Sequence, residues 1–193
     1  NPSVQYPCQS NRIWDGFGML AQLVRRILQA TVYDVAMNTP LDAAPRLSDR
    51  LDNHIRLKRE DLQPVFSFKL RGAYNRMSQL TPDQQARGVV CASAGNHAQG
   101  VALSGKTLGI DTMIVMPRTT PDIKVNAVKR LGGNVVLHGD SFDVANRYAL
   151  QRARDEGRVY IPPYDDELVI AGQGTIAMEM LQQWRAIDYV FVA

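Results

Sequence analysis

One lysine stands where a helix is predicted to begin, within the segment "SFKLRGAYN" that spans residues 67–75. Acidic residues are favoured in a first helical turn because the helix dipole is positive there, so a cation at Lys69 is locally unfavourable. Apolar walls and nearby positive charge both favour the neutral amine, which is the nucleophilic form. The neighbours expected to supply them are Phe66, Phe68, Leu70 and Arg71. Lys69 therefore suits Schiff-base chemistry with a carbonyl, although a solvent-facing lysine is the commoner use of this residue type.

A second candidate for chemistry is the segment "SAGNHAQG", residues 93–100, which directly follows an apolar run. It offers a hydroxyl, an amide and main-chain N–H groups at the predicted start of a helix. Such a helix start is suited to binding a carboxylate or a phosphate. The alternative is a plain strand-to-helix turn in which Ser93 or Asn96 is the N-cap. Several donors, where one cap residue would suffice, favour the anion site.

The segment "AGQGTIA", residues 171–177, carries a competing signal. Gly172, Gly174 and Ala177 match the dinucleotide fingerprint G-x-G-x-x-A. That fingerprint requires a clear strand before it and an acidic residue about twenty positions later. The preceding "DDELVI" is short and acidic. The glycines are therefore expected to let a helix start close against a sheet, and a non-catalytic dinucleotide-binding module is the alternative.

The remaining residue types give weaker signals. His54, His97 and His138 are not spaced like metal ligands, so no metal site is predicted. Cys91 lies in an apolar run and is expected to be a core thiol. Neither a G-x-S-x-G nucleophile elbow nor a P-loop occurs in the sequence.

The elements that must position these residues form a regular alternation of apolar, β-branched runs and amphipathic segments. Strands are predicted at "GVVCAS", "DTMIVMP", "NVVLHG", "RVYIPP" and "DYVFVA". Helices are predicted at "NHAQGVALSGKTLG", "TPDIKVNAVKRLGG", "SFDVANRYALQRARDEG" and "GTIAMEMLQQW". An earlier helix is predicted over residues 14–30, and "HIRLKRED" is strand-like. This order predicts an α/β fold with open wound, mostly parallel sheets covered by helices.

The bulk composition is that of an ordinary soluble globular protein. The 193 residues include 22 basic and 19 acidic ones, and the net charge of +3 is too mild to predict nucleic-acid binding. No apolar run is long enough to span a membrane, so no membrane partner is expected. The two cysteines, Cys8 and Cys91, are far apart in sequence, which favours a reducing compartment. Residues 1–13 are polar and are predicted to form a flexible arm.

Four segments together resemble one family. They are "LKREDLQPVFSFKLRGAYN", "SAGNHAQG", "MPRTTPDIKVNAVKRLGG" and "IPPYDDELVIAGQGTIAMEM". From about Leu23 to Val192 the chain is similar to the threonine dehydratases, or threonine deaminases, of the biosynthetic type, which belong to the fold-type II pyridoxal-phosphate enzymes. The resemblance implies a two-lobed fold like that of the tryptophan synthase β subunit, with pyridoxal 5'-phosphate as cofactor. It also reverses the commoner interpretation of Lys69 as a surface residue.

The resemblance implies a role for each residue of the two motifs. Lys69 would form the Schiff base with pyridoxal phosphate and then act in proton transfer at the substrate α-carbon, and Phe68 would pack beside the cofactor. Asn96 would bind the ring hydroxyl of the cofactor. The loop that receives the substrate carboxylate would be formed by Ser93, Ala94, Gly95, Asn96 and His97. This role agrees with the anion site inferred from the residues themselves.

The implied reaction is that of a threonine ammonia-lyase. L-threonine would lose its α-proton and then its β-hydroxyl, with help from the cofactor phosphate, to give 2-oxobutanoate and ammonia on the route to isoleucine. L-serine would be a secondary substrate that gives pyruvate. The family further implies a cytoplasmic homo-oligomer, either a dimer or a tetramer. A serine dehydratase or racemase of the same family is the alternative.

The resemblance also implies that the domain is incomplete. Residues 14–193 would be the N-terminal part of the catalytic domain, with a small lobe at about residues 81–164 and the remainder in the large lobe. A glycine-rich loop for the cofactor phosphate and a regulatory domain would follow Ala193. The chain alone is therefore expected to bind the cofactor poorly and to turn over little substrate. An inactive truncated chain that associates with complete subunits is a further alternative.

Overall fold

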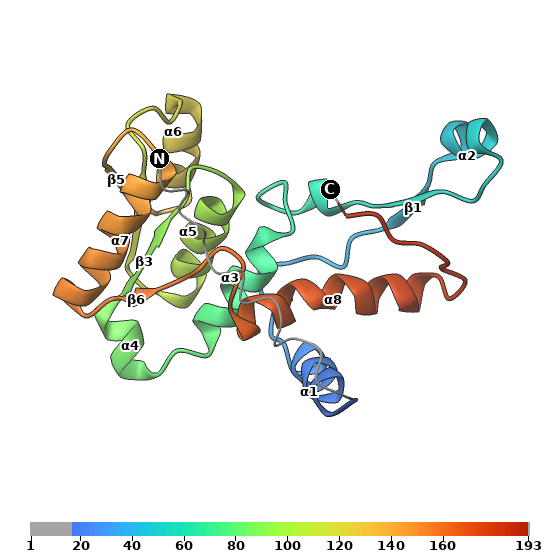
Figure 1. Ribbon diagram of the computed structural model, residues 1–193, viewed down its shortest axis with the longest axis horizontal. Coiled ribbons are helices and arrows are strands. Elements are labelled where there is room, and N and C mark those ends of the chain that lie inside the picture. The colour runs from blue at the N-terminus through green and yellow to red at the C-terminus, as the bar shows by residue number, and fades with distance from the viewer. Residues whose placement is uncertain (1–16, 193) are drawn as a thin grey trace, which may run out of the picture.

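A computed structural model describes residues 17–192, and the arm predicted for residues 1–13 lies outside them. The main feature of the chain is a four-stranded parallel sheet with the strand order β5-β4-β3-β6. The strands are β3 (Val89–Ala92), β4 (Thr112–Met116), β5 (Asn134–Leu137) and β6 (Val159–Tyr160). Figure 1 shows this sheet and its helices at one end of the molecule. The arrangement confirms the predicted α/β fold.

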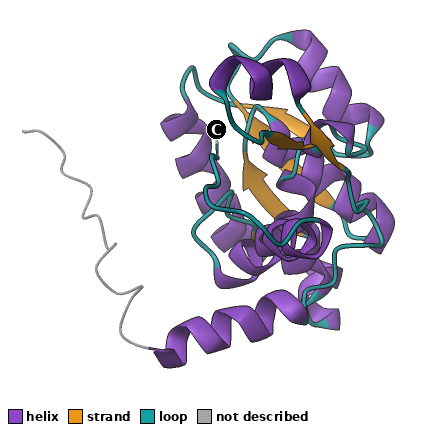
Figure 2. Ribbon diagram, turned by 90° about the vertical axis from the view of Figure 1, so that its right-hand side faces the viewer, coloured by secondary structure: helices purple, strands orange, loops and turns teal. Residues whose placement is uncertain are grey.

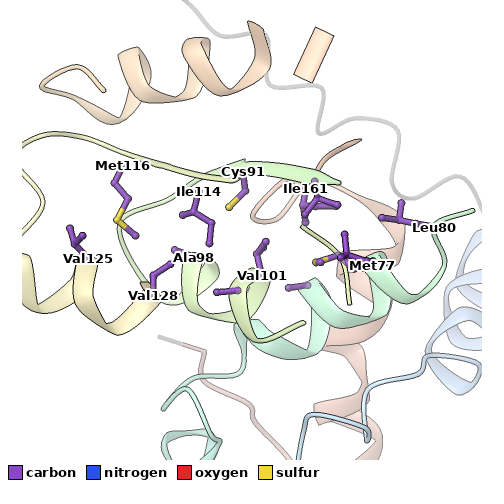
Figure 3. Close-up of a cluster of buried hydrophobic side chains, with 14 residues drawn as sticks. Met77, Leu80, Cys91, Ala98, Val101, Ile114, Met116, Val125, Val128 and Ile161 are labelled. Carbon is purple, nitrogen blue, oxygen red and sulfur yellow. The ribbon is translucent and has the colours of Figure 1, made fainter. Parts of the chain in front are cut away.

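Different helices cover the two faces of this sheet, because side chains alternate along each strand. On β3, Val89 and Cys91 pack with residues of three helices in the core cluster of Figure 3. These helices are α3 (Lys69–Ser78), α5 (Asn96–Leu108) and α6 (Asp122–Arg130). Val90 and Ala92 point to the other face and pack against α7 (Phe142–Glu156). Because helices lie on both sides of the strands (Figure 2), the strands are continuous apolar runs.

Local signals fix the ends of several helices. Helix α4 (Pro82–Arg87) begins with a capping box in which the side chains of Thr81 and Gln84 each bind the main-chain N–H of the other. Gly109 and Gly157 follow α5 and α7 in the left-handed conformation, with φ of 70° and 67°. Glycine adopts this conformation without a Cβ clash, which explains why both helices stop where the sequence predicts.

The parallel register brings two segments together at the carboxyl edge of the sheet. Val90 of β3 pairs with Tyr160 of β6, so the two strands end at nearly the same level. The segment after β3 is the loop of residues 93–95 that leads into α5. The segment after β6, residues 161–166, is called the connector here, and it leads into α8 (Glu167–Gln183). Functional loops of open α/β sheets lie at this edge.

Helices α3 and α8 pack with their backbones almost in contact. A Cβ atom on Gly172 would lie 2.6 Å from the Arg71 carbonyl oxygen and 2.7 Å from the Cα atom of Gly72. A Cβ atom on Gly72 would lie 2.7 Å from the Val169 carbonyl oxygen. Only glycine at both positions lets the two helices approach this closely, because any side chain would push one backbone away from the other.

The position of these glycines corrects two interpretations of "AGQGTIA". Residues 167–183 are helical throughout, so the glycines lie inside α8 and not in a turn between a strand and a helix. The phosphate-binding turn of a dinucleotide site is therefore not formed. The expectation that they start a helix close against a sheet is wrong as well. Gly172 faces α3, and Gly174 faces Ile27 of α1 (Phe17–Leu28).

Replacing Gly172 by alanine is expected to lower the free energy of unfolding by about 2–3 kcal/mol, because the new methyl group overlaps main-chain atoms that cannot rotate aside. Urea unfolding followed by circular dichroism measures the change. Gly18→Ala is the matched control, since a Cβ atom on Gly18 in α1 meets nothing within 4 Å. Alanine is the better helix former, so this control should be neutral or stabilising. Equal effects of the two substitutions would contradict the close approach.

The structure differs from the sequence-based prediction at the last strand. The described residues of "DYVFVA" have no regular secondary structure, and Tyr189 and Phe191 are 82% and 94% exposed. A strand needs a neighbour for its main-chain N–H and C=O groups, and this segment pairs with none within residues 17–192. The predicted strand is therefore not observed, because an apolar pattern does not by itself create a strand.

A two-stranded antiparallel ribbon projects from the rest of the chain (Figure 1). Its strands are β1 (Leu41–Ala43) and β2 (Arg56–Lys58), and α2 (Pro45–Leu51) lies between them. The strand-like pattern of "HIRLKRED" is confirmed by β2, whereas β1 was not predicted. The short 3-10 helix η2 (Glu60–Leu62) then leads towards α3.

Candidate active site

Lys69 is the first residue of α3, and the N-cap residue Phe68 makes no capping hydrogen bond, whereas the Ser67 hydroxyl accepts one from the Lys69 N–H at 3.3 Å. Its Nζ donates a hydrogen bond to the carbonyl oxygen of Pro163 in the connector, with an N···O distance of 3.0 Å. The centroid of the Phe68 ring lies 5.4 Å from the same nitrogen. The half-buried amine is thus directed to one acceptor, which argues against an ordinary surface lysine.

The other expected neighbours of Lys69 do not surround it. Phe66 is 79% exposed and forms no closed wall. Leu70 is fully buried in a core cluster with Val32, Ala36 and Val65. Phe68 is therefore the predicted apolar neighbour that the structure places beside the amine.

Arg71, which was expected to act on Lys69 as a free positive charge, is instead buried between two carboxylates. Its guanidinium donates to Glu60 at 2.9 Å through Nε and through Nη2, and to Glu179 at 2.6 and 3.0 Å. Lys58 Nζ also lies 2.6 Å from Glu179. The charge of Arg71 is neutralised, so the expectation was wrong. The side chain ties α3 to α8 and to η2.

The start of α5 keeps its main-chain donors available. The N-cap residue is Gly95, and no side chain among the described residues caps the helix. The Ser93 hydroxyl accepts a hydrogen bond from the Gly95 N–H at 3.2 Å, which stabilises the turn before the helix. Neither Ser93 nor Asn96 is the N-cap, so the plain-turn alternative is not observed. Uncapped N–H groups and the positive end of the helix together favour an anion.

A glycine brings this helix start close to Lys69. A Cβ atom on Gly100 of α5 would lie 3.0 Å from the Leu70 Cα atom and 3.1 Å from the Lys69 carbonyl oxygen. Both neighbours are main-chain atoms of α3 and cannot move aside cheaply. Glycine at position 100 therefore lets the second turn of α5 contact the first turn of α3. The Lys69 amine and the uncapped start of α5 belong to this pair of helices.

His97, the second residue of α5, points away from solvent and is only 4% exposed. Its Nε2 lies 3.1 Å from the carbonyl oxygen of Ile161 in the connector. A carbonyl oxygen only accepts, so Nε2 carries the ring proton. Within residues 17–192, Nδ1 has no hydrogen-bond partner. Burial lowers the pKa of His97 to about 4 against the opposing hydrogen bond to Ile161, and the charge of Lys69 contributes to the lowering.

This depressed pKa predicts a specific acid sensitivity. The unfolded chain takes up a proton on His97 below pH about 6.5, whereas the folded chain takes it up only near pH 4, so stability falls as the pH is lowered through this window. The loss reaches roughly 3 kcal/mol at pH 4. Urea unfolding of the wild type and of His97→Gln at several pH values should show a flatter dependence for the variant. Parallel curves would contradict the neutral buried imidazole.

The structure brings the predicted site residues to one edge of the sheet. Lys69 and His97 both donate to the connector, and the loop of residues 93–95 leads from β3 to the start of α5. Asn96 is exposed at this start, and Phe68 lies beside the Lys69 amine. Sequence reasoning missed the two carbonyl acceptors of the connector, because every residue carries a carbonyl. Gly100 could have been found, since a glycine inside a helical pattern often marks close packing.

A half-buried amine at one helix start, uncapped main-chain donors at another and a parallel sheet that positions both are the arrangement expected of an α/β enzyme domain with a cofactor site. Residues 32–193 match the family described as pyridoxal-phosphate dependent enzyme, and the chain belongs to this family. This match covers the whole of the parallel sheet, the Lys69 helix and the connector.

Within the family the chain is similar to threonine dehydratases. It is 60% identical over 172 residues to threonine dehydratase 1 biosynthetic, chloroplastic, from Solanum lycopersicum, which covers 89% of this chain and 28% of the relative. It is 55% identical over 172 residues to L-threonine dehydratase biosynthetic IlvA of Escherichia coli strain K12, covering 89% of this chain and 34% of that protein. The chain thus spans about a third of the length of these relatives.

Two solved structures show the same fold. One is the processed form of threonine deaminase isoform 2 from Solanum lycopersicum, with a TM-score of 0.87 and 53% identity over 89% of this chain and 47% of that chain. The other is maize serine racemase, with a TM-score of 0.81 and 32% identity over 86% of this chain and 50% of that chain. The expected relation to fold-type II pyridoxal-phosphate enzymes is confirmed.

No helix among residues 17–192 combines the length and the apolar character needed to cross a membrane.

Proposed function

We propose that the protein containing this chain converts L-threonine to 2-oxobutanoate and ammonia, with pyridoxal 5'-phosphate as cofactor. The observation that carries the proposal is the position of the Lys69 amine, which is hydrogen-bonded to Pro163 beside the uncapped start of α5. The names of relatives that are 54–60% identical support L-threonine as the substrate.

The described residues fit this cofactor by their chemistry. A primary amine, Lys69, is available for an aldehyde, and the Phe68 ring beside it offers an apolar face to a pyridine ring. Asn96 would hold the ring hydroxyl through its carboxamide. The bound cofactor would supply an electron-withdrawing ring that makes the substrate α-proton acidic.

The chain's own residues would bind the substrate carboxylate and move one proton. The main-chain N–H groups at the start of α5, in the loop formed by Ser93, Ala94, Gly95, Asn96 and His97, would hold the carboxylate. Lys69 Nζ would accept the α-proton, and the Pro163 carbonyl would keep the amine aimed at the α-carbon. The β-hydroxyl would then take up one proton, which balances the α-proton that Lys69 accepts, and leave as water, and a second water would release ammonia and 2-oxobutanoate. Closure of a small lobe, at about residues 81–164, would exclude other water from the site.

The test is steady-state turnover by the full-length protein with bound cofactor. We expect 2-oxobutanoate from L-threonine, with a higher kcat/KM than for pyruvate formation from L-serine. A protein that forms pyruvate from L-serine but no 2-oxobutanoate from L-threonine would contradict the substrate assignment, while leaving the cofactor chemistry intact.

A serine racemase is the second candidate, because the solved maize enzyme shares the fold at 32% identity. Formation of D-serine from L-serine, measured by chiral chromatography in the same preparation, separates it from the dehydratase. Racemisation faster than threonine dehydration would favour this second candidate.

The cellular setting is part of the same proposal. Burial raises the pKa of the Cys91 thiol to about 12, so this thiol is unreactive whatever the compartment. We propose the cytoplasm, although the names of the plant relatives place those proteins in the chloroplast. A homo-oligomer of two or four chains is proposed from the family resemblance, and size-exclusion chromatography with light scattering of the full-length protein tests it.

A further inference from the structure

We propose that His97 is a positioning residue for Lys69, acting through the connector. The neutral imidazole donates from Nε2 to the Ile161 carbonyl and so fixes the direction of the Pro163 carbonyl, which receives the Lys69 amine. This inference rests on the proposed role of Lys69. It gives the side chain of His97 a task separate from the carboxylate loop, to which His97 would contribute its main-chain N–H.

The two hydrogen bonds meet in one short segment. His97 Nε2 lies 3.1 Å from the Ile161 oxygen, and Lys69 Nζ lies 3.0 Å from the Pro163 oxygen. The residues between the two oxygens include Pro162 and Pro163, whose rings fix φ near −65°. Ile161 and Pro162 each precede a proline, which restricts their ψ angles to extended values, so the orientation of the first carbonyl limits that of the second.

The other contacts of Ile161 leave its carbonyl group free to tilt, and His97 fixes that group. The Ile161 N–H donates to the Val90 carbonyl at 2.9 Å, and the Ile161 side chain is fully buried in the core. These contacts hold the Ile161 N–H and side chain, but the peptide plane that follows Ile161 can still tilt about ψ. A donor on the Ile161 carbonyl removes that tilt, and His97 supplies it.

The protonation state of His97 suits a fixed donor and not a proton carrier. Nε2 carries the proton because its partner is a carbonyl. Nδ1 is buried without a hydrogen-bond partner in the described chain, so a second proton there would have no acceptor. The imidazole therefore stays neutral and donates through Nε2 alone.

Two substitutions test whether His97 acts as a fixed hydrogen-bond donor or as an acid or a base. Glutamine can place its amide nitrogen near the Nε2 position, whereas asparagine reaches only as far as Nδ1. In the full-length protein with bound cofactor, we expect His97→Gln to keep kcat for L-threonine within about threefold. His97→Asn should lower kcat by about 10- to 100-fold with KM little changed, because a misplacement of about 1 Å costs up to two orders of magnitude.

A kinetic isotope effect tests whether proton transfer is the step that is slowed in His97→Asn. With α-deuterated L-threonine, the isotope effect on kcat should rise in His97→Asn and stay at the wild-type value in His97→Gln. His54→Asn is the matched control, since His54 is exposed near the tip of the ribbon, and it should behave like the wild type. Equal impairment of the Gln and Asn variants, or full activity of His97→Asn, would overturn the proposal.

A measurement on the wild type covers the case in which a variant fails to fold. Long-range ¹⁵N–¹H spectra of the histidine-labelled full-length protein at neutral pH should show one neutral histidine protonated at Nε2, and His97→Gln or chemical-shift assignment identifies it. A proton on Nδ1, or an imidazolium, would overturn the proposal that His97 donates from Nε2 to position the connector. This readout needs no turnover, so it stays informative if L-threonine proves not to be the substrate.

Discussion

Replacing Lys69 by alanine is expected to lower kcat for L-threonine at least about a thousandfold in the full-length protein. The substitution removes the amine that would carry the cofactor and accept the α-proton, and acid–base catalysis alone contributes about 10²- to 10⁴-fold. Lys69→Arg should be nearly as inactive, because a guanidinium keeps the charge but is not nucleophilic. Lys129→Ala, on the exposed surface of α6, is the control and should keep wild-type turnover.

Chemical trapping gives an independent measure of the same residue. Borohydride reduction of the full-length protein with pyridoxal phosphate should fix the cofactor to Lys69 Nζ, and mass spectrometry of the peptides should locate it there. Neither Lys69 variant should be labelled at position 69. A stable label on another lysine of an active protein would show that the amine beside Pro163 is not the reactive one.

Replacing Glu179 by leucine is expected to lower the free energy of unfolding by about 3–5 kcal/mol. Glu179 is 1% exposed and is the shared acceptor of Arg71, Lys58 and Tyr33. Burial alone raises the pKa of Glu179, but hydrogen bonds from Arg71 and Lys58 bring it below its ordinary value, so the group is ionised in the folded chain. Removing it leaves Lys58 without its carboxylate partner and Arg71 with Glu60 alone, and the loss of one partner from a buried ion pair is strongly destabilising.

The control for this prediction is a carboxylate at the surface. Glu167 pairs with Arg26, and both side chains are largely exposed. Exposed pairs contribute about 0–1 kcal/mol, so Glu167→Leu should change the free energy of unfolding by no more than that. Urea unfolding curves of the two variants against the wild type give the comparison. A small effect at Glu179 would mean that Glu60 alone satisfies Arg71.

The fold was predictable to the extent that local patterns determine it. The four strands of the parallel sheet and the helices that cover it follow from apolar runs, helix stops and alternation, and the signal is clearest at β3 and β4, which are buried on both faces. The last strand was not predictable in this way, since Tyr189 and Phe191 need a neighbouring strand and not only a suitable pattern. The start of α8 was also misplaced, because the acidic residues before it cap a helix: Asp166 binds the N–H groups of Leu168 and Val169.

The site could be predicted where the type of a residue indicates its chemistry. It could not be predicted where only the fold determines which residues are in contact. Lys69 and the loop of residues 93–97 were singled out by their types and by the family resemblance. Arg71 was misjudged, because its partners Glu60 and Glu179 are 11 and 108 residues away in sequence and only the fold brings them together. The roles assigned to Phe68, Ser93 and Asn96 stay predictions, since they concern atoms of the cofactor and the substrate.

The two acceptors of the connector belong to the main chain, and this determines which changes the segment can accumulate. A substitution at Ile161 or Pro163 retains the carbonyl oxygen that His97 or Lys69 binds. An insertion or a deletion of one residue between them would displace one oxygen by about 3.3 Å along the chain, which is longer than a hydrogen bond. A change in the length of this segment is therefore incompatible with both hydrogen bonds, whereas a substitution acts on them only indirectly, through the burial of Ile161 or the φ angles that the prolines fix.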